Sequence, residues 1–193
     1  MDKDYKIIEA GNKSKQGLVA RLKSTSEQGI VVGEINENNQ GWQIQFSFDN
    51  KSIVKRLDIN EIELTGKIDN DNLLLRLARD IFSTDSKTKL WTSEILCSFI
   101  EEYGADLKLE NLGQTIDKMI ELLSKDNDYD IDQKLAEGIF EFIWLNKLDK
   151  KEEKRLLIRL AKLNKDVLFC YLDDEDYRKV REVDDFIKQG RKY

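Results

Sequence analysis

The chain has 193 residues, of which 40% are hydrophobic and 36% are charged. This composition supplies enough apolar side chains for a packed core and excludes an intrinsically disordered chain. The net charge of −6 disfavours long-range attraction to nucleic acid, and the sequence has no histidine, the side chain that most often transfers protons or binds metals near neutral pH. We therefore expect a protein that is not an enzyme and that uses no metal or other cofactor.

No segment of the sequence predicts contact with a membrane. The apolar runs are shorter than the roughly 20 residues of a transmembrane helix, and the first residues, MDKDYKIIEAGNKSK, include no apolar signal segment. Cys97 and Cys170 lie in apolar helical segments, where cysteine is usually a small buried side chain. These features predict a cytoplasmic protein with two buried thiols.

Residues 1–66 predict a small β domain. Apolar and polar side chains alternate in this region, which is the period of a half-buried strand, and turn-forming stretches such as 36–41 divide it into short segments. A sheet this small protects its edges best by closing on itself, so we expect a five-stranded β-barrel. The predicted strands span 17–23, 30–35, 42–48, 53–57 and 62–65.

The segment GLVARLKSTSEQGIVVGEINENNQGWQIQFSFDNKSIVKRLDINEIELTG has the order of features of a known type of module. Gly29 begins the second strand, and a hydrophobic strand QIQFSF, a polar turn DNKS, a basic strand and a closing segment INEIEL follow. The segment resembles an SH3-like or Tudor-like barrel, of the type found at the front of bacterial helicases and of factors that dock on RNA polymerase. The resemblance covers about a quarter of the chain, and it implies docking on a nucleic-acid-handling machine.

The predicted strand 42–48 has an aromatic face. Trp42, Phe46 and Phe48 share this face with Ile44, so we interpret them as the core of the barrel. The alternative is an aromatic cage, in which these three rings and Tyr5 hold a methylated lysine or arginine by cation–π attraction.

The polar face of the same strand supplies candidate binding residues. It carries Gln43 and Gln45, and the next strand adds Lys55 and Arg56. Such a face can receive a peptide strand or a phosphate backbone. Residues 1–67 contain ten basic and ten acidic side chains, so their long-range attraction to nucleic acid is weak.

Beyond Gly66 the apolar residues recur at helical spacing, so residues 67–193 predict an all-α helical bundle of about six helices. Asp149, followed by Glu152, is typical of a helix N-terminus, and Gly104 is typical of a residue just after a helix. The short connections make successive helices antiparallel neighbours, in either a bundle or a stack of repeats. The predicted helices span 70–82, 90–103, 111–124, 131–146, 149–164 and 175–189, with a short helical segment at 167–172.

An acidic connection between two predicted helices partly matches a calcium-binding loop. Asp126, Asp128, Asp130 and Glu137 occupy positions 1, 3, 5 and 12 of an EF-hand, with Asp132 at position 7. The hinge position, which requires glycine, is an isoleucine, and a lysine occupies position 9. We therefore interpret the segment as a solvated connection in which Asp130 or Asp132 caps the following helix.

The predicted helix 149–164 lies in the most basic part of the chain. Residues 147–165 contain eight lysines and arginines and three acidic residues. Lys151, Arg155 and Arg159 lie four residues apart, so they form one stripe on the helix and repel one another. Two interpretations remain open: the stripe pairs with acidic neighbouring helices, or it contacts a phosphate-bearing or acidic macromolecule.

These observations favour a cytosolic, non-enzymatic adaptor or regulatory subunit that mediates protein–protein interaction. The expected partner is another protein, through which the chain reaches nucleic acid, and the oligomeric state is left open. The candidate binding residues are Gln43, Gln45, Lys55, Arg56, Lys151, Arg155 and Arg159. Three alternatives remain: a nucleic-acid-binding module that uses the basic helix, an acidic immunity or inhibitor protein, and a hydrolase with carboxylates around a divalent ion.

Overall fold

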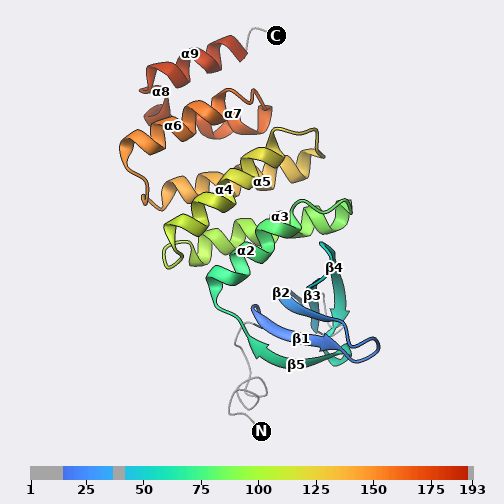
Figure 1. Ribbon diagram of the computed structural model, residues 1–193. Coiled ribbons are helices and arrows are strands. Elements are labelled where there is room, and N and C mark those ends of the chain that lie inside the picture. The colour runs from blue at the N-terminus through green and yellow to red at the C-terminus, as the bar shows by residue number, and fades with distance from the viewer. Residues whose placement is uncertain (1–14, 37–41, 191–193) are drawn as a thin grey trace. The chain divides into compact units, whose positions relative to one another are not determined.

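The computed structural model describes residues 15–36 and 42–190. In this part of the chain there are five strands and eight α-helices, which form an α+β architecture (Figure 1). The contacts within the chain divide it into two compact units, Met1–Ile95 and Leu96–Tyr193. Among the described residues, no helix combines the length and the apolar composition that crossing a bilayer requires.

The first unit contains a five-stranded antiparallel sheet. Its strands are β1 (Leu18–Leu22), β2 (Gln28–Asn36), β3 (Trp42–Phe48), β4 (Val54–Asp58) and β5 (Ile62–Lys67), in the order β4-β3-β2-β1-β5. All five predicted strands are confirmed, with ends that differ by one or two residues. The alternating pattern of β3 was informative because one face of this strand is apolar and the other is polar.

The sheet is not closed, so the predicted barrel is wrong. β4 and β5 are the two outermost strands, and a 3-10 helix, η1 (Ile59–Glu61), lies between them in the chain. The Asp58 side chain accepts a hydrogen bond from the backbone N–H of Asn60 at 2.7 Å, and the backbone N–H of Asp58 donates to Glu61 at 2.8 Å. This capping box satisfies the turn locally, so the chain passes from β4 to β5 without pairing these strands.

The aromatic residues of β3 contribute to the core on one side of the sheet. Phe46 and Phe48 are almost completely buried, and their rings meet edge to face with centroids 5.2 Å apart. Their interpretation as core residues is confirmed. Tyr5 and the side chain of Trp42 lie outside the described part of the structure. The remaining buried members of this cluster are Ala20, Leu22, Val31, Ile44 and Ile62.

Two helices contact the sheet, α2 at β3 and α3 at β4. In α2 (Asn70–Asp80), the carboxylate of Asp80 accepts a hydrogen bond from the hydroxyl of Ser47. In α3 (Ser86–Tyr103), the hydroxyl oxygen of Thr88 accepts from the backbone N–H of Val54 at 3.1 Å. The sequence predicts a domain boundary after residue 66, where the strand pattern stops, whereas the compact unit continues to Ile95 and includes α2 and the first part of α3.

The second unit contains helices in successive contact. They are α4 (Leu109–Leu123), α5 (Tyr129–Trp144), α6 (Lys150–Ala161), α7 (Asp166–Leu172), α8 (Glu175–Arg178) and α9 (Arg181–Gly190). α4 packs on α5, α5 packs on α7, and α6 packs on both α7 and α9. Figure 1 shows these helices in layers, α4 with α5, then α6 with α7, then α8 with α9.

The predicted helix 175–189 is two helices in the structure. The helix is interrupted at Lys179 and Val180, between α8 and α9. Tyr177 is buried with its ring centroid 6.0 Å from that of Phe140, and Val183 is also buried. Residues six positions apart do not share a face of a continuous helix, so the break brings both side chains into the core.

Candidate functional site

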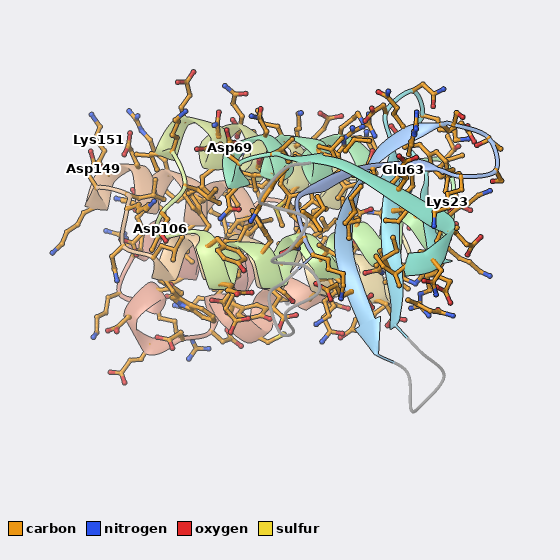
Figure 2. The ribbon with its side chains drawn as sticks, turned by 90° about the horizontal axis from the view of Figure 1, so that it is seen from below. Lys23, Glu63, Asp69, Asp106, Asp149 and Lys151 are labelled. Carbon is orange, nitrogen blue, oxygen red and sulfur yellow. The ribbon has the colours of Figure 1, made fainter. Side chains whose placement is uncertain are left out.

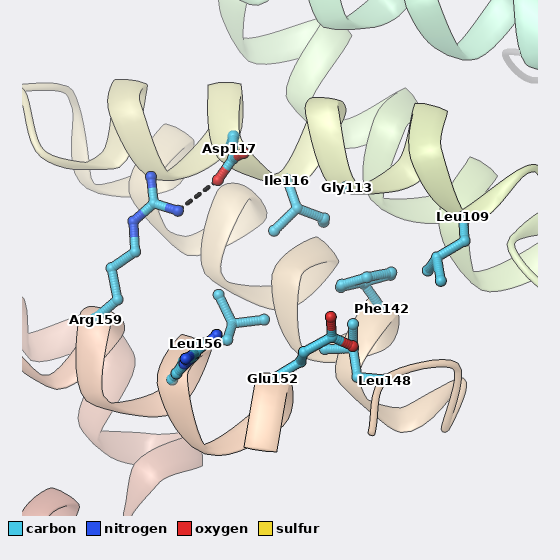
Figure 3. Close-up of a pocket in the computed structure, with 10 residues that line it drawn as sticks. Leu109, Gly113, Ile116, Asp117, Phe142, Leu148, Glu152, Leu156 and Arg159 are labelled. Carbon is cyan, nitrogen blue, oxygen red and sulfur yellow. Dashed lines mark hydrogen bonds and ion pairs between the residues drawn. The ribbon is translucent and has the colours of Figure 1, made fainter. Parts of the chain in front are cut away.

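A groove in the second unit lies between α4 and α6 (Figure 3). Its volume is 510 Å³, within the range of ligand-binding clefts. Helix α4 contributes four lining residues, Leu109, Gly113, Ile116 and Asp117, and α5 contributes Phe142. The remaining lining residues are Leu148, which lies two residues before α6, and four residues of α6: Glu152, Arg155, Leu156 and Arg159.

Helical periodicity explains why these residues meet in one groove. The lining positions of α4 and of α6 recur every three or four residues, so each helix presents a single stripe to the groove. The stripe of α4 includes Leu109, which is 45% exposed although it is a large apolar residue. At Gly113 an added Cβ atom would meet no atom within 4 Å, so the groove is open above this glycine. The groove thus has apolar walls that no described part of the chain covers completely.

Charged side chains lie at the border of the groove. The guanidinium of Arg159 pairs with the carboxylate of Asp117 across it, as the dashed line in Figure 3 shows. The side chains are 49% and 65% exposed, so water screens this pair and it contributes little to stability. Arg159 of the predicted stripe is therefore paired within the chain.

Three other cations of the basic segment also have partners in the second unit. The ammonium of Lys154 lies 2.8 Å from Glu182, and that of Lys165 lies 2.7 Å from Asp132. Lys147 donates a hydrogen bond to the carbonyl oxygen of Leu107 at 2.7 Å. Internal pairing, one of the two interpretations of the basic segment, therefore holds for part of it.

Of the remaining cations, Lys162 at the end of α6 lies 5.3 Å from the centroid of the Phe186 ring, and the other three lie in the first turns of α6. Within residues 15–36 and 42–190, the side chains of Lys150, Lys151 and Arg155 make no hydrogen bond or ion pair. Figure 2 shows Lys151 beside Asp149 at the start of the helix, where Asp149 accepts hydrogen bonds from the backbone N–H groups of residues 151 and 152, both at 2.8 Å. The positive end of the helix dipole thus lies close to two lysines, which is unfavourable.

The candidate residues of the sheet have different surroundings. Gln43 is half-buried, and Gln45 is only 5% exposed because α2 and α3 cover its face of β3. The expected open polar face is therefore wrong at Gln45. Lys55 and Arg56 are exposed on β4, and the guanidinium of Arg56 lies 4.6 Å from the centroid of the Trp91 ring. These residues belong to the first unit, and the α6 stripe belongs to the second.

A buried polar network holds the polar face of β3 to α2. Arg79 donates to the carbonyl oxygens of Phe48 and Asp49 at 2.8 and 3.0 Å, and it pairs with Asp80 at 2.6 Å. Asp80 is 0% exposed and also accepts from Ser47. Burial raises the pKa of Asp80, although the hydrogen bond from Ser47 and the charge of Arg79 oppose this change. The network is buried beneath the sheet and has a structural role.

The carboxylates of the acidic connection before α5 do not cluster around one point. Asp132 is buried, and its two oxygens accept from Asn127 at 2.8 Å and from Lys165 at 2.7 Å. The N-cap of α5 is Asp128, not Asp130 or Asp132 as predicted, because the helix begins two residues earlier than its apolar pattern suggests. The described residues contain no group of three or more acidic or cysteine side chains arranged to hold a metal ion.

The two cysteines differ in exposure. Cys97 is buried, and burial raises its pKa to about 12, which keeps it a neutral thiol. Cys170 is exposed on α7, so its predicted burial is wrong. The apolar neighbours of Cys170 in the sequence lie on the other faces of this short helix.

Sequence reasoning identified two of the groove residues, Arg155 and Arg159, and missed its apolar walls. Leu109 and Gly113 lie at the start of α4, which begins two residues earlier than predicted. A glycine inside a helical pattern without a turn is a signal of special packing or of an open surface. Gly113 is such a glycine, and it could have indicated the open surface from the sequence alone.

Comparisons of the chain with models of known families, with characterised proteins and with solved structures find no match.

Proposed function

We propose that this protein is a non-enzymatic adaptor or regulatory subunit and that its partner-binding surface is the groove between α4 and α6. One observation carries the proposal: an open groove with apolar walls lies next to cations that have no partner in the described chain. Exposed apolar surface with a polar rim is characteristic of sites that bind other proteins.

The chemistry of the groove favours binding over catalysis. The lining side chains include no serine, threonine, cysteine or lysine that would act as a nucleophile. Of the two carboxylates, that of Asp117 is held by Arg159. The sequence contains no histidine, the side chain that most often serves as a general base. The groove therefore has the composition of an interaction surface.

The proposed partner is a cytoplasmic protein, and the SH3-like or Tudor-like resemblance of the sheet region suggests that it belongs to a nucleic-acid-handling machine. Lys55 and Arg56 are exposed on β4 and offer a second contact for such a partner. An acidic inhibitor that neutralises another protein would use the same kind of groove, so it is a special case of this proposal. Direct binding of nucleic acid has less support, because Arg159 is paired and the net charge is −6.

The test is a pull-down from cells that express the chain. The wild-type protein and two variants serve as baits, and the proteins that they capture are compared. Gly113→Leu fills the groove, and Gln114→Leu adds the same side chain to the neighbouring exposed position of α4, outside the groove. We expect one or more proteins captured by the wild type and by Gln114→Leu to be lost with Gly113→Leu. Circular dichroism verifies that all three baits are folded. Capture of the same proteins by all three baits would contradict the proposed surface.

A further inference from the structure

We infer that the groove binds an amphipathic α-helix of the partner protein, with its apolar side chains between α4 and α6 and an acidic side chain paired with Arg155. This inference rests on the proposed function and specifies the shape and charge of the partner segment. It follows from the length of the groove, from its walls and from the charges at the start of α6.

The walls of the groove fit a helix. The α4 stripe extends from Leu109 to Asp117, and the α6 stripe extends from Glu152 to Arg159. Eight residues of α-helix are about 12 Å long, so the groove is about two helical turns in length. A helix that lies in a groove of this length presents side chains i, i+3, i+4 and i+7 to it. The half-buried Leu148 provides apolar surface between the two stripes, and the almost completely buried Phe142 lies beneath it in the lining (Figure 3).

The unpaired cations define the charge of that helix. Arg155 lines the groove, and Lys151 lies one turn before it on α6. Neither side chain has a hydrogen-bonding or ionic partner in the described chain. A carboxylate placed between them would form charge-assisted hydrogen bonds and would offset the unfavourable position of Lys151 near the positive end of the helix dipole. A basic helix would meet three cations, unpaired in the described chain, in the first two turns of α6: Lys150, Lys151 and Arg155.

A phosphate backbone fits this site less well than a carboxylate does. Glu152 lines the same groove as Arg155, and Glu153 follows it in the sequence, so two carboxylates lie between Lys151 and Arg155. A polyanion brings many negative charges to this surface, whereas a single carboxylate can approach Arg155 alone. The apolar walls also have no role in binding a phosphate backbone. Nucleic acid is therefore an outcome that the experiment must distinguish.

The experiment is a selection from displayed helical peptides of about 16 residues, capped at both ends so that they form a helix. Apolar residues are fixed at the i, i+3, i+4 and i+7 positions, and the flanking positions are randomised among Glu, Lys, Gln and Ser. Peptides are selected on the full-length wild-type protein, and those that also bind Gly113→Leu are removed. Dissociation constants are then measured by fluorescence anisotropy at about 150 mM salt, near physiological ionic strength.

We expect selected peptides to carry glutamate beside the apolar stripe. Arg155→Glu should weaken their binding about tenfold, the effect of losing one charge-assisted hydrogen bond, and replacing that glutamate by lysine should restore it. Arg181→Glu makes the same charge change on α9, outside the groove, and should leave binding unchanged. Both arginines are exposed, so neither change should affect folding.

Three results would overturn the inference: selection of no helical peptide, enrichment of lysine at the flanking positions, or affinity that does not depend on Arg155. Binding of a duplex DNA that is lost with Arg155→Glu and retained with Gly113→Leu would assign the start of α6 to nucleic acid. If Gly113→Leu loses captured proteins while no acidic helix is selected, the adaptor proposal stands and this inference is wrong.

Discussion

At the scale of single residues, two glycines that both lie inside helices differ in the space around them. At Gly113 an added Cβ atom meets nothing within 4 Å, whereas at Gly138 it would lie 2.8 Å from the side chain of Met119 and 3.3 Å from the backbone of Cys97. No packing contact within the described chain requires the first glycine, and the second permits close contact between helices. The two positions therefore form a matched pair for mutagenesis.

We predict that Gly113→Ala stabilises the protein by about 0.5–1 kcal/mol, because alanine restricts the unfolded chain and improves helix propensity. For a chain of this size that change raises the Tm by about 1–4 °C. Gly138→Ala should lower stability by about 1–3 kcal/mol, because the added methyl group overpacks the core. Thermal unfolding followed by circular dichroism measures both. Equal effects of the two substitutions would show that the groove is closed in solution.

The buried carboxyl of Asp80 predicts a specific dependence of stability on pH. Its pKa in the folded protein is raised above the ordinary value of 3.8, chiefly by burial. The folded state therefore holds this proton to a higher pH than the unfolded state does, and the contribution of Asp80 to stability decreases as the pH rises from 3.8 to the raised value. Above that value the contribution is constant.

Asp80→Asn tests this dependence, because asparagine cannot ionise. We predict that the free energy of unfolding of the wild type, measured relative to that of Asp80→Asn, decreases with rising pH through this range. Urea unfolding at a series of pH values measures the difference. Asp85→Asn is the comparison, because hydrogen bonds from Thr88 lower the pKa of the exposed Asp85 carboxyl, so the pH trend should have the opposite sign. An increase of the Asp80 difference with pH would show that pairing with Arg79 outweighs burial.

At the scale of elements, helix α6 carries charges that oppose its own dipole. Lys150 and Lys151 occupy its first two positions, and Asp149 caps it. Cations are unfavourable at a helix N-terminus, so Lys150 and Lys151 oppose the dipole, whereas Glu152 and Glu153 of the same turn interact favourably with it. On the proposed function, binding of an acidic partner segment offsets this cost.

We predict that Lys151→Glu stabilises the free protein by about 0.3–1 kcal/mol and weakens binding of acidic helical peptides. Lys162→Glu, the same change at the C-terminal end of α6, should lower stability, because it reverses a favourable charge there and removes the contact of Lys162 with the Phe186 ring. Urea unfolding measures the first effect, and fluorescence anisotropy with the selected peptides measures the second. A loss of stability in Lys151→Glu would show that Lys151 has a stabilising role in the free chain.

At the scale of the whole molecule, the sheet and α2 form one compact unit, although the change of sequence pattern separates them. Arg76 and Arg79 of α2 both donate to the carbonyl oxygen of Phe48, at 2.9 and 2.8 Å, and the Asp80 carboxylate accepts from Ser47. These contacts tie the helix to β3. The helices from α4 onward have their buried residues within the second unit.

We predict that a fragment of residues 68–193 remains helical and unfolds cooperatively, and that α2 loses its stability in this fragment. In hydrogen exchange, the amides of 73–80 should lose protection relative to the full chain, while those of α4 and α5 should keep it. Loss of protection throughout the fragment would show that the two units fold as one. Full protection of α2 would show that its contacts with the sheet are dispensable.

The sequence by itself determined the elements of this protein. Alternation of apolar residues placed all five strands, and helical spacing together with caps such as Asp149 placed most of the helices. These features are local, because burial of one face imposes the period of each element on its own residues. The basic stripe of α6 was also evident in the sequence, since it depends only on spacing within one helix.

The tertiary structure decided how those elements combine. It left the sheet open, buried Gln45 beneath two helices, paired Arg159 with Asp117 and left Arg155 without a partner in the described chain. It also joined stripes from α4 and α6 into a groove. Each of these outcomes depends on residues far apart in the sequence. Periodicity reports which face of an element is buried, but it does not identify the element that covers that face.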